Sequence, residues 1–339
     1  MGQKLITGII ATARRDPKRV VYPEALDYEV LKAADMAATQ GIAHPVLVGP
    51  VDKVRELIRR HGLTGLGGVP ILDPSIETER MDRYSRRLFA RRQRRGMTIH
   101  DARRFVGEYN YFAAALVEAG EADAMVSGRT RPYPQVIRPA LQLIGTDQTA
   151  ETPRTGERTG RVSGLYVVNT RRGTYFFADT TVNVSPDLDA LMDIIELTVR
   201  RVRDFEIEPV VALLSYSNFG SAPGEQATRM AEATARAKQR FPDITIDGEI
   251  QANVALDPEL LAKNYPFSDL VGKRVNTLIF PNLSSGNIAY KLLGMLGGGE
   301  LLGPILSGMA KPVHILQMGA DAREILQITA LAVTDAQRR

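Results

Sequence analysis

The stretch that decides the fold is TLIFPNLSSGN, residues 277–287. Its first four residues, Thr277 to Phe280, form a short apolar run that is typical of a buried strand. The loop from Pro281 to Asn287 is small and polar, and a helical segment follows it. A strand, a small polar loop and a helix in this order indicate an open α/β fold, in which ligands bind beyond the carboxyl ends of the strands.

A second stretch repeats this pattern. Val210 to Ser215 is predicted to be a buried strand, and residues 216–221, YSNFGS, follow it before another helix. Free backbone N–H groups and the helix dipole at such a point favour anions, and glycine allows a phosphate to approach the backbone. Either loop alone is explained as well by glycine and serine closing a turn. Two such loops in one predicted sheet favour a phosphate-bearing ligand.

Short apolar runs alternate with amphipathic segments along the rest of the chain. Arg19–Pro23 and Pro45–Val48 are strand-like, whereas Tyr28–Gln40 and Val51–His61 are helix-like. This alternation predicts βαβ units around a mainly parallel sheet. Because 339 residues exceed the size at which one hydrophobic core usually stops growing, we expect two α/β lobes.

Four local expectations can be compared with the structure. Residues 98–119 are expected to form one long helical stretch, and the polar residues 146–160 are expected to be a lobe crossover or a mobile loop. Residues 162–169 and 174–182 are expected to pair as a hairpin. Ser185, which a proline follows, is expected to start a helix.

The composition excludes several classes of site. Hydrophobic residues at 44% and charged residues at 24% are ordinary values for a soluble protein, and no apolar run is long enough to span a bilayer. The absence of cysteine excludes thiolate nucleophiles and cysteine-bound zinc. We expect neither a metal site nor a histidine-based triad, because the four histidines are isolated: His44, His61, His100 and His314. The N-terminus lacks the apolar run of a secretion signal, so we expect a cytoplasmic protein with no membrane partner.

The formal charge of +4 is modest, but arginines crowd one predicted helix. They are Arg86, Arg87, Arg91, Arg92, Arg94 and Arg95. Charge runs usually form a solvated face, and this interpretation is favoured for most of them. Nucleic acid is not expected as a partner, because no aromatic residues interleave with the arginines and no reading motif is present. A small phosphate-bearing ligand would need only one or two of them.

Several motifs occur in order along the chain. They are ADAMVSG (122–128), IRPALQ (137–142), FAD (177–179), IFPNLSSGNIAYK (279–291), GPIL (303–306) and KPV (311–313). Together they resemble the phosphate acetyl/butyryltransferase family. The resemblance implies one α/β lobe from residues 1–152 with 305–339, a second from 153–304, a CoA-binding cleft between them, and a homodimer or higher homo-oligomer.

The same resemblance implies a set of acetyl-CoA-binding residues. They are Ser217, Asn218, Gly220, Ser221, Asn282, Ser285, Gly286, Asn287, Tyr290, Lys291, Gln317 and Met318. Lys291 is expected either to meet a phosphate or to be solvated. Asp179 is expected either to cap the turn after its strand or to line the cleft.

In the active transferases of this family, an aspartate acts as base toward the CoA thiol, a serine polarises the acyl carbonyl and arginines hold the phosphate. The resemblance assigns the phosphate to Arg138 and Arg92. At the serine, arginine and aspartate positions this chain has Gln317, Met318 and Glu324. Met318 cannot donate the charged, forked hydrogen bonds of an arginine, and Glu324 adds a methylene to the base. No intact catalytic set is therefore expected.

These three residues and the C-terminal sequence look most like the transacetylase-like domain of hybrid NADP-dependent malic enzymes. That resemblance implies an acetyl-CoA-binding sensor and dimerisation domain that regulates a malic-enzyme catalytic domain. Acetyl-CoA is then an effector, and the domain itself holds no cofactor.

Two alternatives stay open. One is an active phosphate acetyl- or butyryltransferase, in which Glu324 serves as base and Arg138 with Arg92 holds the phosphate. The other is an assembly module with a vestigial cleft, which would form dimers without CoA affinity.

Overall fold

The structure is a computed structural model that describes residues 2–147, 160–297 and 299–339. The chain forms two compact units. The terminal unit consists of Gln3–Asp147 with Met309–Arg339, and the central unit is the described part of Gln148–Gly308. The expected crossover at 146–160 lies almost entirely outside the described residues.

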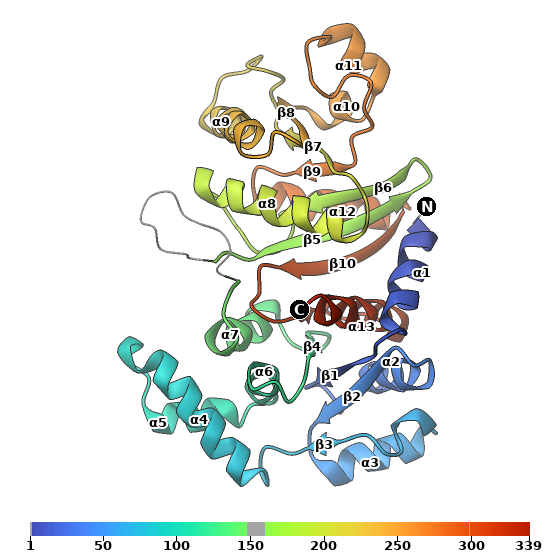
Figure 1. The fold of residues 1–339 in the computed structure, drawn as a ribbon, viewed down its shortest axis with the longest axis vertical. Coiled ribbons are helices and arrows are strands. Elements are labelled where there is room, and N and C mark those ends of the chain that lie inside the picture. The colour runs from blue at the N-terminus through green and yellow to red at the C-terminus, as the bar shows by residue number, and fades with distance from the viewer. Residues whose placement is uncertain (1, 148–159, 298) are drawn as a thin grey trace. The chain divides into compact units, whose positions relative to one another are not determined.

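The terminal unit is built on a sheet of five parallel strands in the order β11-β4-β1-β2-β3 (Figure 1). The strands are β1 (Lys18–Tyr22), β2 (Ala43–Val48), β3 (Ile71–Leu72), β4 (Ala124–Ser127) and β11 (Val313–Ile315). Strand β4 is buried throughout, and β1 and β2 are buried except at Lys18, Arg19 and His44. A parallel sheet needs cover on both faces, which explains why the buried parts of these strands are mostly apolar.

Helices supply that cover. They are α1 (Gly2–Ala13), α2 (Tyr28–Thr39), α3 (Val51–Arg60), α4 (Thr78–Arg92), α5 (Ile99–Val106), α6 (Tyr109–Glu118), α7 (Tyr133–Leu143) and α13 (Ala322–Gln337), with short 3₁₀ turns at Thr64–Leu66 and Gln93–Arg95. Helix α13 packs on β1 and β4 beside α2, and α6 packs on the same strands beside α7 (Figure 1). The buried Tyr22 hydroxyl contacts the Thr329 hydroxyl at 2.9 Å, which ties β1 to α13.

The expectation of one helical stretch over residues 98–119 is wrong. Helix α5 ends at Val106, and α6 begins only at Tyr109. Between them, Glu108 has an extended backbone, with φ of −80° and ψ of 136°, and its carboxylate makes no capping hydrogen bond. The break exposes Glu108 and directs α6 away from α5.

The central unit contains a six-stranded sheet in the order β10-β5-β6-β9-β7-β8. Its strands are β5 (Ser163–Thr170), β6 (Gly173–Ala178), β7 (Val210–Leu214), β8 (Thr245–Ile250), β9 (Thr277–Ile279) and β10 (Glu300–Ser307). Its helices are α8 (Leu188–Asp204), α9 (Glu225–Arg240), α10 (Ala252–Ala255), α11 (Pro258–Asn264) and α12 (Leu283–Met295). Four of its strands are parallel, and β5 and β6 form the expected hairpin. The α/β class with mainly parallel sheets is confirmed.

Two boundaries in this unit differ from expectation because of aspartates. Strand β6 stops at Ala178, since the buried Asp179 carboxylate accepts the N–H groups of Thr181, Val182 and Asn183 at 2.7–3.1 Å. Asp179 therefore caps the turn after its strand. The next helix, α8, is capped by Asp187 rather than started at Ser185, because the Asp187 carboxylate accepts the Ala190 N–H at 2.8 Å.

Among the described residues, no helix is both long enough and apolar enough to cross a membrane.

Candidate functional site

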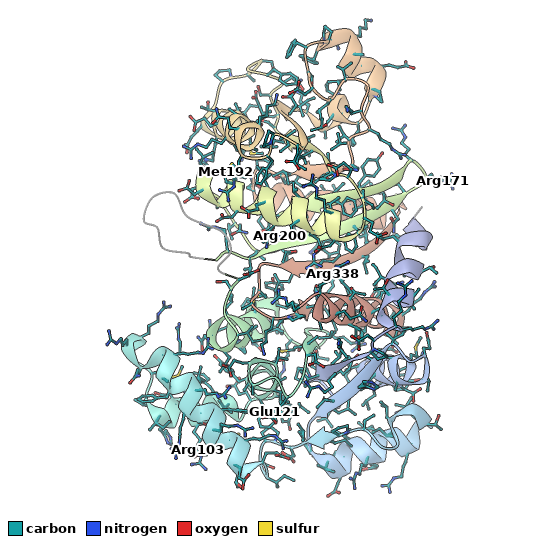
Figure 2. The ribbon with its side chains drawn as sticks, in the orientation of Figure 1. Arg103, Glu121, Arg171, Met192, Arg200 and Arg338 are labelled. Atoms are coloured by element: carbon teal, nitrogen blue, oxygen red, sulfur yellow. The ribbon has the colours of Figure 1, made fainter. Side chains whose placement is uncertain are left out.

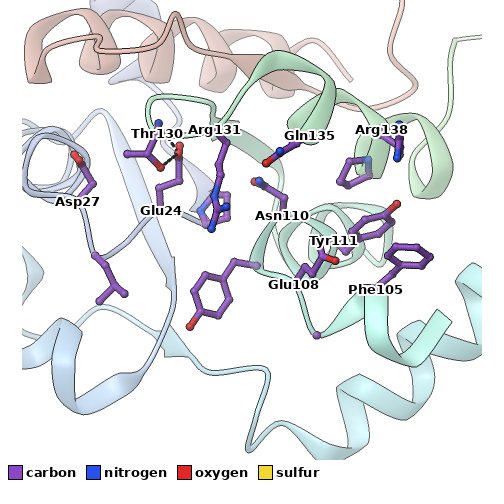
Figure 3. A pocket seen from close by; sticks show the side chains of 15 residues that line it. Glu24, Asp27, Phe105, Glu108, Asn110, Tyr111, Thr130, Arg131, Gln135 and Arg138 are labelled. Atoms are coloured by element: carbon purple, nitrogen blue, oxygen red, sulfur yellow. Dashed lines mark hydrogen bonds between the residues drawn. The ribbon is translucent and has the colours of Figure 1, made fainter. Parts of the chain in front are cut away.

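A pocket of about 800 Å³ lies within the terminal unit (Figure 3). Three segments supply its walls: the loop after β1, the junction of α5 and α6, and the loop that leads from β4 into α7. The lining residues are Pro23, Glu24, Leu26, Asp27, Phe105, Gly107, Glu108, Tyr109, Asn110, Tyr111, Thr130, Arg131, Gln135, Arg138 and Pro139. Parallel strands deliver their following loops to the same edge of a sheet, which is where such folds bind ligands.

One wall of the pocket is organised by a buried carboxylate. Glu24 follows β1 and accepts hydrogen bonds from the backbone N–H groups of Gly128, Arg129 and Thr130 at 2.6, 3.1 and 2.7 Å. The hydroxyls of Ser127 and Thr130 also donate to it, at 3.2 and 2.5 Å. Successive N–H groups of this kind form an anion-binding nest, and here the protein fills the nest with its own carboxylate.

The geometry of this loop requires glycine at its first position. Gly128 has a φ of +117°, a region that other residues rarely adopt. A Cβ atom at Gly128 would lie 2.9 Å from the Ile315 side chain and 3.0 Å from the Leu316 carbonyl oxygen. The loop is therefore pressed against the end of β11. Arg129 fixes its other side by pairing with Asp27 and by donating from Nε to the Ala320 carbonyl at 2.9 Å.

Arg138 lines the opposite side of the pocket, beside Tyr111 (Figure 3). Burial, together with the negative charge of Glu108, raises the pKa of Tyr111, and the positive charges of Arg138 and Arg92 oppose that rise. The Nε of Arg92 is buried and has no hydrogen-bond partner among the described residues. Arg138 therefore lines the pocket, whereas Arg92 lies outside its lining, and the assignment of both arginines to phosphate binding stays a prediction.

Most other arginines of α4 have acidic partners. Arg86 pairs with Asp82, and both Arg87 and Arg91 pair with Glu118. Arg80 and Arg83 pair with Glu121, which Figure 2 labels. The interpretation of most of this charge run as a solvated, ion-paired face fits these contacts. Arg92 differs from Arg87 and Arg91 because it has no such partner in the described part of the chain.

The loop that follows β7 is closed on itself. Ser217 is fully buried, and its hydroxyl donates to the buried Glu249 carboxylate at 2.8 Å. The Gly220 N–H donates to the same carboxylate oxygen at 2.7 Å, and the Ser221 hydroxyl accepts the Asn218 N–H at 2.8 Å. The donors that were expected to meet a phosphate are therefore engaged by a carboxylate and by the loop itself.

The loop that follows β9 serves mainly to position α12. Asn282 caps the helix by accepting the Ser285 N–H at 2.9 Å. A Cβ atom at Gly286 would lie 2.6 Å from the Asp179 carbonyl oxygen, so this glycine allows α12 to approach the end of β6. The Asn287 amide donates to the Thr180 carbonyl at 3.3 Å.

The next two predicted residues of α12 point in different directions. Tyr290 is buried in the core of the central unit, where its ring stacks on Tyr166 with centroids 3.9 Å apart. Lys291 is exposed. Of the two, only Lys291 is accessible to an anionic ligand in this structure.

The three positions that depart from the family pattern follow β11. Gln317 and Met318 are exposed, with Met318 at 62% of its full accessibility. Glu324 is also exposed and belongs to the capping box of α13: its carboxylate accepts the Asp321 N–H at 2.9 Å, while Asp321 accepts the Glu324 N–H at 2.8 Å. None of the three lines the pocket of the terminal unit.

Sequence reasoning missed several residues of the pocket wall. Glu24 and Arg131 lie in loops after apolar strands, so the sequence places each of them at the end of a strand. That their two loops lie side by side depends on the order of the strands. Glu108 was hidden inside an expected helix. In the described ranges, no group of three or more histidine, aspartate or glutamate residues is placed to hold a metal ion.

A two-unit α/β protein with an arginine-bearing pocket at the carboxyl edge of a parallel sheet is the class that this fold and site define. The chain belongs to the phosphate acetyl/butaryl transferase family, which matches residues 4–333. A solved phosphotransacetylase from Streptococcus pyogenes has the same fold, with a TM-score of 0.88, 32% identity and 99% coverage of both chains.

Curated relatives fall into two groups. The phosphate acetyltransferase of Acetivibrio thermocellus is 37% identical over 97% of this chain and 97% of its own length. The NADP-dependent malic enzyme of Salmonella typhimurium is 36% identical over 97% of this chain but only 42% of its own length. In that second protein, the similarity therefore covers one part of a longer chain.

Proposed function

We propose that this chain transfers an acyl group between CoA and phosphate, as a phosphate acyltransferase. The proposal is supported by its similarity, over nearly the whole of both chains, to a protein named phosphate acetyltransferase and to a solved phosphotransacetylase. The observation that carries it is the position of Arg138 in the lining of the pocket, beside Tyr111. Guanidinium groups suit a phosphate because they donate paired, charge-assisted hydrogen bonds.

In the forward direction, the sulfur of CoA attacks the carbonyl carbon of acetyl phosphate. The S–C bond forms, the bond from that carbon to the bridging oxygen breaks, and inorganic phosphate leaves with its electron pair. Arg92 and Arg138 would stabilise the charge on the leaving phosphate. The thiol proton passes to a carboxylate base, which returns it to solvent.

Glu324, which lies outside the lining of the pocket, is the base that the resemblance to the active transferases implies. Its Oε2 atom accepts the Asp321 N–H, which leaves Oε1 to take a proton. Serine and arginine are absent from positions 317 and 318, so an oxyanion contact and one phosphate contact of the family are missing. Loss of one such group costs roughly 10²- to 10³-fold in rate, so we expect a slow enzyme.

The test is thioester formation from acetyl phosphate and CoA, followed by ultraviolet absorbance. Wild type should produce acetyl-CoA, and Arg138→Gln should lower kcat/KM by about 10²- to 10³-fold. Arg103→Gln is the matched control, because Arg103 is exposed on α5 and lies outside the pocket. A wild-type rate no higher than the uncatalysed rate would refute the proposal.

A second candidate is the acetyl-CoA-binding regulatory and dimerisation domain of a hybrid malic enzyme. It is favoured by the exposed Met318, which cannot hold a phosphate, and by the malic-enzyme relatives that this chain matches over part of their length. The chain would then bind acetyl-CoA as an effector, with a malic-enzyme catalytic domain as partner.

The variant that carries Gln317→Ser, Met318→Arg and Glu324→Asp separates the two candidates. If wild type binds acetyl-CoA in calorimetry but forms no thioester, and the variant gains transfer, the regulatory candidate is favoured. If wild type already forms thioester and the variant is only faster, the chain is a transferase. Sedimentation of wild type with and without acetyl-CoA tests the homodimer.

A further inference from the structure

Arg131 is a second cation in the lining of the pocket, separate from Arg138. It lies in the loop between β4 and α7 and is exposed to solvent. Figure 3 shows Arg131 on the side of the pocket formed by Glu24 and Asn110, whereas Arg138 lies on the side of Tyr111 and Phe105. The pocket therefore presents two separate points of positive charge.

The position of Arg131 is fixed by the residue before it. Thr130 is held through both its N–H and its hydroxyl, which donate to Glu24 at 2.7 and 2.5 Å. Pro132 follows Arg131 and restricts its backbone, and α7 begins at Tyr133. Because its backbone is restricted on both sides, Arg131 has only its side chain left to order on binding a ligand.

The acids around Arg131 leave it available. Glu24 already accepts five hydrogen bonds, and Asp27 is paired with Arg129. Glu108 is the remaining carboxylate in the lining, and no ion pair joins it to Arg131 among the described residues. Arg131 is exposed and has no hydrogen-bond or ion-pair partner among the described residues either, so its guanidinium is accessible to a ligand in the pocket.

The pocket is also larger than a two-carbon acyl phosphate requires. It has a volume of about 800 Å³, whereas acetyl phosphate has only eight non-hydrogen atoms. The amides of Asn110 and Gln135 and the ring of Tyr109 line the remaining space. These three side chains are uncharged, and Glu108 is the only unpaired carboxylate near them among the described lining residues, so a longer ligand with an anion at each end has room between Arg131 and Arg138.

We propose that Arg131 recognises a second anionic group on the substrate, so that the preferred acyl donor is a dicarboxylic one whose free carboxylate meets Arg131 while its phosphate meets Arg138. This inference rests on the acyl transfer proposed above. It goes beyond that proposal, because acetyl and butyryl groups carry no such charge.

Binding of two matched phosphonates tests the inference without turnover. Phosphonobutyrate carries a carboxylate at the end opposite its phosphonate, and butylphosphonate carries a methyl group there. In calorimetry at low salt, wild type should bind phosphonobutyrate about 10-fold more tightly, which is the expected value of a charged hydrogen-bonded pair. Arg131→Gln should reduce this ratio to about 1.

Two further variants serve as controls. Arg138→Gln should weaken both ligands by a similar factor, and Arg103→Gln should change neither. Arg131→Lys keeps the charge without the forked geometry, so it should retain part of the discrimination and exclude misfolding as the cause of its loss. A ratio near 1 in wild type, failure of both ligands to bind, or a 10-fold ratio that survives Arg131→Gln would overturn the inference.

Phosphate-dependent release of CoA from succinyl-CoA and butyryl-CoA separates this inference from the proposed function. If Arg131→Gln slows only the reaction of succinyl-CoA, both stand. If both thioesters react and the variant affects neither or both equally, the inference fails and the transferase remains. If neither reacts while the phosphonate ratio is 10-fold and depends on Arg131, the transferase fails and the anion site remains.

Discussion

Two loops of this protein each surround a carboxylate of the same chain, but the two loops differ in what lies next to them. In the terminal unit, the loop after β4 wraps around the carboxylate of Glu24. In the central unit, the loop after β7 wraps around the carboxylate of Glu249. The first loop continues into the pocket through Arg131. The second loop borders no part of that pocket.

A strand, a small polar loop and a helix therefore do not by themselves form a ligand site. Backbone N–H groups at the end of a strand need an anion, and the protein can supply it from its own chain. The pocket of the terminal unit differs because two arginines of its lining, Arg131 and Arg138, have no acidic partner among the described residues. An arginine without an acidic partner is therefore a better indicator of a ligand site than the strand–loop–helix pattern.

The largest expected effect comes from the glycines of the two loops. Gly128→Ala should destabilise the protein by about 4 kcal/mol, because strain at a φ of +117° adds to contacts with Ile315 and Leu316. Gly220→Ala should cost only about 1 kcal/mol, since Gly220 has a φ of +85° and open space around it. Urea unfolding of both variants measures the difference, and equal losses would contradict the tighter packing of the first loop.

The two carboxylates should differ next. Glu24→Gln should cost about 3 kcal/mol, because the amide cannot accept all five hydrogen bonds that Glu24 now receives. Glu249→Gln should cost about 1.5 kcal/mol, because two donors lose a charged acceptor. Only the first variant should also weaken phosphonate binding at the pocket. Urea unfolding measures the two losses of stability, and calorimetry on the folded variants measures phosphonate binding. Weaker binding in Glu249→Gln would contradict the separation of the two loops.

The smallest expected effect on stability comes from an ion pair at the start of β1 and β4, the strands that precede Glu24 and its loop. Asp123, just before β4, accepts hydrogen bonds from the Arg19 side chain and backbone at 2.7–3.0 Å. Burial alone would raise the pKa of Asp123, but these bonds outweigh burial and lower the pKa from its ordinary value of 3.8. The pair then contributes stability above that value and loses it as the pH falls through the lowered pKa.

Because Arg19 is half exposed, the contribution of the pair should be about 0.5 kcal/mol. Urea unfolding of wild type and Asp123→Asn at pH 7 and at pH 3 measures it. Wild type should be more stable than the variant at pH 7, and this advantage should shrink at pH 3. An advantage that grows on acidification would contradict the lowered pKa.

The fold class could be predicted from the sequence because a fold class is indicated by local patterns of apolar and polar residues. Buried parallel strands must be short and apolar, so segments such as Val210–Leu214 and Thr277–Ile279 were readable without any tertiary information. The break between α5 and α6 was not readable, because Gly107 and Glu108 interrupt a helical pattern that otherwise continues. Helix propensity is too weak a signal to place such a break.

The site was predicted only in part, for a physical reason. Arg138, which lines the pocket, could be named from the sequence, but the partners of a loop depend on which distant strand lies beside it. Glu24 meets residues more than one hundred positions further along the chain, and Glu249 meets Ser217 across two neighbouring strands. The residue types of a loop indicate which groups can donate hydrogen bonds. Only the order of the strands shows that a carboxylate of the same chain, Glu24 or Glu249, already accepts those hydrogen bonds.

The strand order also has a consequence for synthesis on the ribosome. Strand β4 lies between β1 and β11, and β11 comes from the last part of the chain. Until residues 128–315 have been made, β4 has an open edge, and at about 5–20 residues per second this takes roughly 10–40 s. The central unit lies within this interval, so it can fold first. An open strand edge attracts other chains, and slower translation should therefore increase aggregation of the nascent protein.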